Sequence, residues 1–140
     1  KDIQEALKDI KVFGRSEVVP NKLGLKILID YAHTPSSLQS ILETVKPYTK
    51  GRVICTWGVG GDRDSKKRPI MGEISGNLAD LTILTSDQVR TEDPNKILDD
   101  IEVGLKKSGG KYVRILNRTE AIKYALSKDI LAYFHFHLHL

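Results

Sequence analysis

Residues 58–69 form a glycine-rich, cationic segment directly after the apolar run 53–57. The segment reads Gly-Val-Gly-Gly-Asp-Arg-Asp-Ser-Lys-Lys-Arg-Pro, which places three glycines, two aspartates and four cations in one turn. Glycine lets backbone N–H groups approach an anion, and an arginine fork binds a carboxylate or phosphate through two parallel hydrogen bonds. The segment lacks the third glycine of a dinucleotide fingerprint and the Gly-Lys-Ser/Thr of a P-loop. It therefore predicts an anion site without identifying the anion.

Two further segments combine charged and turn-forming residues. Residues 30–35 read Asp-Tyr-Ala-His-Thr-Pro, and residues 86–94 read Ser-Asp-Gln-Val-Arg-Thr-Glu-Asp-Pro. Like the glycine-rich segment, each follows a predicted strand and precedes a predicted helix. Loops at the carboxyl ends of parallel strands converge, and helix N-termini favour anions. We therefore expect the three loops to favour an anionic ligand.

The elements that position these loops are predicted from short apolar runs alternating with amphipathic stretches, a pattern typical of strands joined by crossover helices. The predicted strands are residues 16–19, 26–30, 52–57, 81–85, 112–116 and 130–134. The predicted helices are residues 36–46, 69–78, 94–107 and 119–127, with a short helix in residues 1–12. The predicted fold class is α/β: a single Rossmann-like domain with a mostly parallel six-stranded sheet flanked by helices.

Composition excludes several classes of protein. A chain of 140 residues that is 40% apolar and 29% charged suits one globular domain. The net charge of +4 is scattered and aromatic residues make up 6% of the chain, so no nucleic-acid partner is expected. No apolar run reaches the about 20 residues that span a bilayer, so no membrane partner is expected. Cys55, the only cysteine, predicts a buried structural thiol in a reducing cytoplasm.

The ordered motifs resemble the C-terminal domain of the Mur ligases, most closely the MurE members, which add the third amino acid of the peptidoglycan stem. The resemblance covers roughly residues 14–127 and rests on motifs in a fixed order. These motifs are Gly14-Arg15-Ser16-Glu17, Asp30-Tyr31-Ala32-His33-Thr34-Pro35, Gly60-Gly61-Asp62-Arg63-Asp64, Lys67-Arg68-Pro69-Ile70-Met71-Gly72, Leu78-Ala79-Asp80, Thr85-Ser86-Asp87 and Arg90-Thr91-Glu92-Asp93-Pro94.

The resemblance implies a part in ATP-dependent amide formation, in which a substrate carboxylate becomes an acyl phosphate that an amine attacks. In this family a central domain holds the P-loop and the magnesium ligands, and the C-terminal domain closes over the nucleotide and presents the amino acid. ATP and Mg²⁺ would thus be held mainly by a central domain of the same protein, and this chain alone would be inactive. Residues 1–12 would be a linker or the end of that central domain, and residues 13–140 the C-terminal domain, in a cytoplasmic monomer.

The same resemblance implies roles for single residues. Arg15 and His33 would lie at the nucleotide phosphates, and Asp30 would accept a hydrogen bond from the ribose. Arg63 would bind the carboxylate of the incoming diamino acid. No catalytic or metal-binding residue is implied in this chain.

Asp87, Gln88, Val89 and Arg90 occupy the segment where diaminopimelate-adding members carry Asp-Asn-Pro-Arg, whose arginine holds the distal carboxylate. Gln88 and Val89 depart from that pattern: the fixed φ of proline is lost, and the amide lies one methylene farther from the backbone. Because Arg90 keeps the charge, the predicted acceptor is meso-diaminopimelate, with L-lysine as the competitor. The second substrate would be UDP-N-acetylmuramoyl-L-alanyl-D-glutamate.

The segment 128–140 is the second departure, because Mur ligases of this type continue into Gly-Lys-Gly-His-Glu. Here His135, His137 and His139 alternate instead. On a strand the three imidazoles would share one face and could hold a metal ion, but an exposed tail is the favoured interpretation. The tail is consistent with truncation or a changed reading frame.

Several interpretations remain open at this point. Asp30 could cap the following turn, Arg90 could pair with Glu92 or Asp93, and Arg68 is as much a solvated loop charge as a ligand contact. The whole chain could belong to a sister amide ligase of the cyanophycin or folylpolyglutamate synthetase type. It could also be a non-catalytic module or remnant that binds an anion or a nucleotide.

Overall fold

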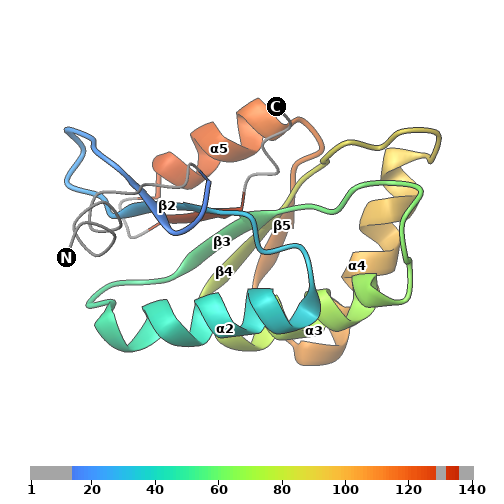
Figure 1. The fold of residues 1–140 in the computed structure, drawn as a ribbon, viewed down its shortest axis with the longest axis horizontal. Helices are drawn as coiled ribbons and strands as arrows, with labels where there is room; N and C mark the ends of the chain where they lie inside the picture. Colours follow the sequence, from blue (N-terminus) through green and yellow to red (C-terminus); the bar gives the residue numbers. More distant parts are fainter. Residues whose placement is uncertain (1–13, 129–131, 136–140) are drawn as a thin grey trace, which may run out of the picture.

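The computed structural model describes residues 14–128 and 132–135, which form an α/β domain (Figure 1). Its strands are β1 (Glu17–Val19), β2 (Ile27–Asp30), β3 (Ile54–Trp57), β4 (Leu81–Leu84), β5 (Tyr112–Arg114) and β6 (Ala132–His135). Its helices are α2 (Pro35–Val45), α3 (Lys67–Leu78), α4 (Pro94–Ser108) and α5 (Arg118–Leu126), with a 3-10 turn η1 at Lys46–Tyr48. The α/β class predicted from the alternating pattern is confirmed.

The sheet has the strand order β1-β2-β6-β3-β4-β5. β3, β4 and β5 form a parallel unit, whereas β1 and β2 form a small antiparallel hairpin. The short β6 pairs in parallel with β2 and with β3. Four of the five strand pairings are parallel, as predicted, and the departure is the antiparallel β1–β2 hairpin at one edge of the sheet. The hairpin is antiparallel because residues 20–26 are fewer than the about twelve that a parallel crossover needs.

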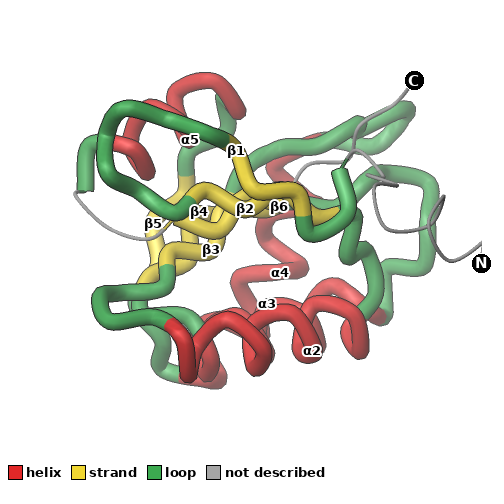
Figure 2. The backbone as a smooth tube through the Cα atoms, turned by 60° about the vertical axis from the view of Figure 1, so that its left-hand side comes forward, coloured by secondary structure: helices red, strands yellow, loops and turns green. Residues whose placement is uncertain are grey.

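The sheet lies between two helical layers: α2, α3 and α4 cover one face and α5 covers the other (Figure 1 and Figure 2). Successive residues of a strand point to opposite faces. Cys55 and Trp57 accordingly join the core under α2, α3 and α4, and Ile54 joins the core under α5. All four residues of β3 are buried, as expected for a strand covered on both sides.

Two of the helices that follow the singled-out loops begin with a side-chain cap and a proline. The Thr34 side chain accepts a hydrogen bond from the Ser37 N–H at the start of α2, and Asp93 accepts one from the Asn95 N–H at the start of α4. Both helices have a proline in the first turn, where its missing N–H costs nothing. These caps already occupy N–H groups at both helix starts.

Helix boundaries agree with the sequence expectations to within two residues, whereas several strands are shorter than expected. β3 spans Ile54–Trp57 instead of residues 52–57, and β5 ends at Arg114 instead of residue 116. The 3-10 turn η1 was not predicted. Pro47, its second residue, has no backbone N–H with which to continue α2, and that helix ends at Val45.

The expected helix in residues 1–12 lies outside the described residues, as do His137 and His139. His135 is the last residue of β6. The expectations for the N-terminal linker and for the histidine tail therefore stay predictions. Within the described residues, every helix falls short of the length and apolarity that a membrane span requires.

Candidate functional site

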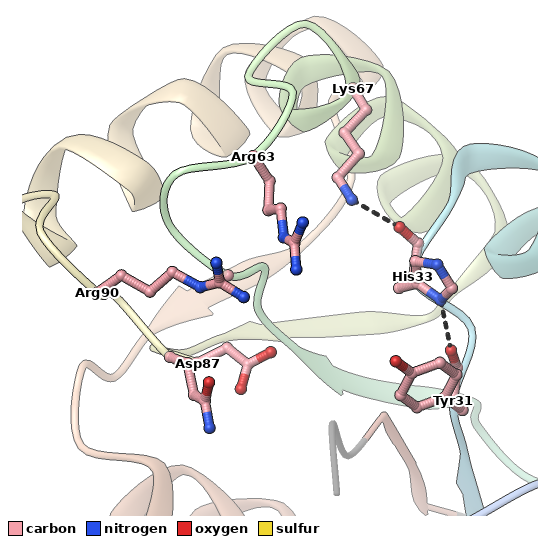
Figure 3. Close-up of a pocket in the computed structure, with 8 residues that line it drawn as sticks. Tyr31, His33, Arg63, Lys67, Asp87 and Arg90 are labelled. Atoms are coloured by element: carbon pink, nitrogen blue, oxygen red, sulfur yellow. Dashed lines mark hydrogen bonds between the residues drawn. The ribbon is translucent and has the colours of Figure 1, made fainter. Parts of the chain in front are cut away.

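A cavity of about 280 Å³ lies where the loops after β2, β3 and β4 meet (Figure 3). Each of the three loops singled out in the sequence contributes to it, because parallel strands end on one side of the sheet. Its lining residues are Tyr31, His33, Gly60, Arg63, Lys67, Asp87, Gln88 and Arg90.

The cavity combines three cationic side chains with one carboxylate. Arg63 and Arg90 extend from different loops into the same space, with Asp87 beneath them (Figure 3). The Asp87 side chain is 4% exposed, and its Oδ1 accepts a hydrogen bond from Arg118 Nη1 at 2.9 Å. Burial lowers the pKa of Lys67, and the neighbouring Arg63 acts in the same direction. The site is thus predominantly cationic and holds one fixed anion.

His33 stands at the edge of the cavity, between β2 and α2. Its Nδ1 lies 3.1 Å from the Tyr31 carbonyl oxygen. Lys67 donates a hydrogen bond from Nζ to the His33 carbonyl oxygen at 2.9 Å, which ties the start of α3 to the loop after β2 (Figure 3). The Arg15 guanidinium lies 5.2 Å from the centre of the Tyr31 ring, within the range of a cation–π contact. Arg15 therefore lies beside Tyr31 and does not itself line the cavity.

Asp30 stabilises the local backbone. Its Oδ2 accepts hydrogen bonds from the Ser16 N–H at 2.7 Å and from the Ser16 hydroxyl at 3.2 Å, and its Oδ1 accepts one from the Ala32 N–H at 2.8 Å. Ser16 has a φ of 47°, so these bonds hold a residue in the left-handed region. Asp30 is not among the cavity-lining residues, and its placement supports the turn-stabilising alternative. A nucleotide contact by Asp30 stays a prediction.

The loop after β4 divides its residues between the cavity and the core. Asp87, Gln88 and Arg90 line the cavity, whereas Val89 packs against the core under α2, α3 and α4. An apolar side chain gains free energy by this burial. Val89 therefore lies outside the cavity lining, and a substrate contact by this residue stays a prediction.

The glycine-rich loop is held against the loop after β4. A Cβ on Gly58 would lie 2.1 Å from the Thr85 carbonyl oxygen, and a Cβ on Gly61 would lie 2.0 Å from the Val89 carbonyl oxygen. The Gly61 N–H donates a hydrogen bond to the Gln88 carbonyl oxygen at 2.8 Å. The interpretation that these glycines bring N–H groups to an anion is corrected for Gly61, whose N–H serves this contact between loops.

Arg68 forms a buried ion pair and is not a cavity residue. Its side chain is 1% exposed and lies 2.7 Å from Glu92 Oε1 and 2.9 Å from Asp100 Oδ2. The hydrogen bonds from Arg68 lower the pKa of Glu92 to about 2. Because Glu92 pairs with Arg68 and Asp93 caps α4, these two carboxylates are engaged elsewhere and do not pair with Arg90.

Three cavity residues, and one residue that holds a cavity side chain in place, were not predicted from the sequence. Tyr31 and Gly60 lie inside the quoted motifs, and Lys67 lies in the cationic run, but none was assigned a role. Their position in the same loops as His33 and Arg63 was the available signal. Arg118, which holds Asp87, lies on α5 and no local pattern marks it.

A family model described as Mur ligase, glutamate ligase domain matches residues 14–132, and the chain belongs to this family. Within it, the chain is similar to the UDP-N-acetylmuramoyl-L-alanyl-D-glutamate--2,6-diaminopimelate ligase of Caldanaerobacter subterraneus subsp. tengcongensis. The identity is 49% over 127 residues, which is 91% of this chain and 26% of the relative. The ligase of the same name from Alkaliphilus metalliredigens is 50% identical over 115 residues, covering 82% and 23%. The chain thus spans about a quarter of the length of these relatives.

Solved structures agree with this assignment. A 2,6-diaminopimelate ligase superposes with a TM-score of 0.79 at 36% identity, covering 91% of this chain and 27% of that one. A folylpolyglutamate synthase from Thermotoga maritima superposes with a TM-score of 0.68 at 24% identity, covering 95% and 30%. A bifunctional folylpolyglutamate synthase from Yersinia pestis, solved with AMPPNP and manganese, has a TM-score of 0.70 at 15% identity, covering 95% and 30%. The last two likenesses show the fold alone.

Among residues 14–128 and 132–135, no three His, Cys, Asp or Glu side chains come together in an arrangement that could hold a metal ion.

Proposed function

We propose that this chain is the C-terminal, acceptor-presenting domain of an ATP-dependent amide ligase. The ligase adds meso-diaminopimelate to UDP-N-acetylmuramoyl-L-alanyl-D-glutamate in peptidoglycan precursor synthesis. In the proposal the ligase is a monomer and acts in the cytoplasm. The observation that carries the proposal is the cavity in which Arg63 and Arg90 enter from separate loops beside the buried Asp87.

The charges of this cavity match a dicarboxylate amino acid better than L-lysine. In the proposal Arg63 binds the carboxylate next to the reacting amine, Arg90 binds the distal carboxylate, and Asp87 accepts hydrogen bonds from an ammonium group. A guanidinium binds a carboxylate through a charge-assisted, bidentate pair. Lysine has no second carboxylate, so one cation would lose water without gaining a partner.

The domain contributes position and charge to the reaction. The amine nitrogen attacks the carbonyl carbon of the acyl phosphate, the C–N bond forms, phosphate leaves with the C–O electron pair, and the nitrogen releases one proton to solvent. Holding the amine against the acyl phosphate removes most of the entropic cost of that encounter. His33 lines the cavity and Arg15 lies beside the Tyr31 ring, and in the proposal both approach the nucleotide phosphates.

ATP and Mg²⁺ are assigned mainly to a central domain of the same protein. When bound there, they activate the substrate carboxylate as an acyl phosphate. In the proposal, Gln88 and Arg90 of this domain select the acceptor amino acid. Residues 13–140 form the proposed domain, with residues 1–12 leading into it.

A chimeric ligase tests the proposal. This chain replaces the C-terminal domain of the Caldanaerobacter ligase, and that ligase's own domain, rejoined at the same junction, is the control. Mass spectrometry should detect the diaminopimelate product from the chimera, and Arg63→Ala should abolish it. The isolated 140-residue chain should not hydrolyse ATP. Exclusive use of L-lysine would contradict the acceptor assignment, and no product from the chimera beside an active control would favour a non-catalytic module.

A further inference from the structure

The two loops that carry Arg63 and Arg90 are joined by four side chains, here called the loop clasp: Asp62, Arg68, Thr91 and Glu92. Asp62 directly precedes Arg63, and Thr91 directly follows Arg90. The clasp therefore connects the immediate neighbours of both cavity arginines.

The inner half of the clasp is reciprocal. Asp62 accepts hydrogen bonds from the Thr91 hydroxyl at 2.7 Å and from the Thr91 N–H at 3.2 Å. In return, the Asp62 N–H donates to Glu92 Oε1 at 2.5 Å. Each loop thus supplies both a donor and an acceptor, which fixes their relative orientation more tightly than one bond would.

The outer half anchors the clasp to the helical layer. Arg68, in the first turn of α3, binds both carboxylate oxygens of Glu92, at 2.9 Å from Nη1 and 2.7 Å from Nη2. Its Nη1 also donates to Asp100 on α4 at 2.9 Å. The Arg68 side chain is 1% exposed, whereas Glu92 and Asp100 are 25% and 36% exposed, so the guanidinium end of the anchor is shielded from solvent.

The backbone on both sides of the clasp needs such support. Asp62 has a φ of 53° and Arg90 has a φ of 52°, which places both in the left-handed region that residues with a Cβ rarely adopt. The conformation at Arg90 decides where its side chain leaves the loop. Relaxation toward the ordinary region would redirect the guanidinium.

We propose that the loop clasp is a positioning device in which Glu92 and Arg68 hold the guanidinium groups of Arg63 and Arg90 at the spacing of the two carboxylates of a dicarboxylate amino acid. The inference rests on the proposed function and deepens it, because it names the residues that set the preference for a dicarboxylate over a monocarboxylate acceptor. Glu92 and Arg68 are positioning residues that do not touch the ligand.

Two variants of the same ion pair provide a matched test. Glu92→Gln removes the charge of the carboxylate that binds Arg68 from the loop after β4. Asp100→Asn removes the charge of the carboxylate that binds Arg68 from α4 and leaves both loops unchanged. NMR titrations of the isotope-labelled 140-residue chain give dissociation constants for meso-diaminopimelate and for L-lysine. Without ligand, hydrogen exchange at the Asp62 and Thr91 amides reports on the clasp itself.

We expect Glu92→Gln to reduce the selectivity for diaminopimelate over lysine by about tenfold, the worth of one charge-assisted hydrogen bond, and to speed exchange at both amides. Asp100→Asn should lower stability and leave selectivity unchanged. Unchanged selectivity in Glu92→Gln, or an equal loss in both variants, overturns the clasp as a positioning device while the proposed function stands. If the wild-type chain binds neither amino acid, the proposed function falls and the clasp's assigned role falls with it.

Discussion

Replacing Gly61 by alanine should destabilise the domain, whereas the same replacement at Gly60 should not. Neither glycine is in the left-handed region, so alanine is free of backbone strain at both positions, and the gain from a stiffer unfolded chain is the same for both. They differ in the space available. A Cβ on Gly61 would lie 2.0 Å from the Val89 carbonyl oxygen, and a Cβ on Gly60 would lie 3.5 Å from its nearest neighbour, the Gln88 carbonyl oxygen.

The magnitude follows from these distances. To reach an ordinary contact the two loops must separate by about 1.5 Å, which breaks the 2.8 Å hydrogen bond from the Gly61 N–H to the Gln88 carbonyl oxygen. Overpacking costs about 1–3 kcal/mol and the lost bond about 1 kcal/mol, offset by about 0.4–1 kcal/mol from the stiffer unfolded chain. The free energy of unfolding should therefore fall by about 1–3.5 kcal/mol in Gly61→Ala and rise by up to about 1 kcal/mol in Gly60→Ala.

Urea unfolding followed by the fluorescence of Trp57 measures both values, because Trp57 is the only tryptophan and is 0% exposed. Gly61→Ala should also weaken binding of meso-diaminopimelate, since the moved loop carries Arg90. Equal stability of the two variants would refute the reasoning, and the glycines would then have to be explained by an approach to a ligand.

Three further predictions follow from single interactions. Arg68 lowers the pKa of Glu92 from its ordinary value of about 4.5 to about 2, so the ionised carboxylate stabilises the fold fully above about pH 4.5 and loses this contribution as the pH falls toward 2. Urea unfolding should show this loss of stability in the wild type. An unchanged acid profile in Glu92→Gln would contradict it. Thr34→Ala removes the cap of α2 and should lower the free energy of unfolding by about 0.5–2 kcal/mol. Thr44→Ala, on the exposed side of the same helix, should lower the free energy of unfolding by less. Equal effects of the two substitutions would contradict the role of the cap. Burial raises the pKa of the Cys55 thiol, so a thiol reagent should modify it only on unfolding, and rapid modification of the native protein would contradict its burial.

The elements were predictable because each has a local signal. The helix starts at Pro35 and Pro94 follow a capping residue and agree with the structure within one residue. The apolar run 53–57 predicted a strand over residues 52–57, and β3 lies within it with all four residues buried. The antiparallel pairing of β1 with β2 also had a signal, the short connection 20–26, which outweighs the general preference for parallel order.

The site was predictable in part. The three loops could be identified from residue types, and His33, Arg63, Asp87, Gln88 and Arg90 line one cavity. What escaped the sequence depends on contacts between distant segments. Nothing local distinguishes Arg68, which is buried between Glu92 and Asp100, from the exposed Lys66 and the half-buried Lys67 beside it.

The inward turn of Val89 has the same origin. A single apolar residue between Gln88 and Arg90 has no periodic pattern that would reveal which side faces the core. Its packing depends on how the loop after β4 lies against the core.

The central claim is that this cavity binds a diamino acid through two carboxylates, and an NMR titration of the wild-type chain tests it most directly. With meso-diaminopimelate, the backbone signals of Gly60, Arg63, Asp87 and Arg90 should shift together with the guanidinium signals of the two arginines. L-lysine should shift the Arg90 signals far less. Saturable shifts confined to another surface, or equal responses of Arg90 to both amino acids, would contradict the account.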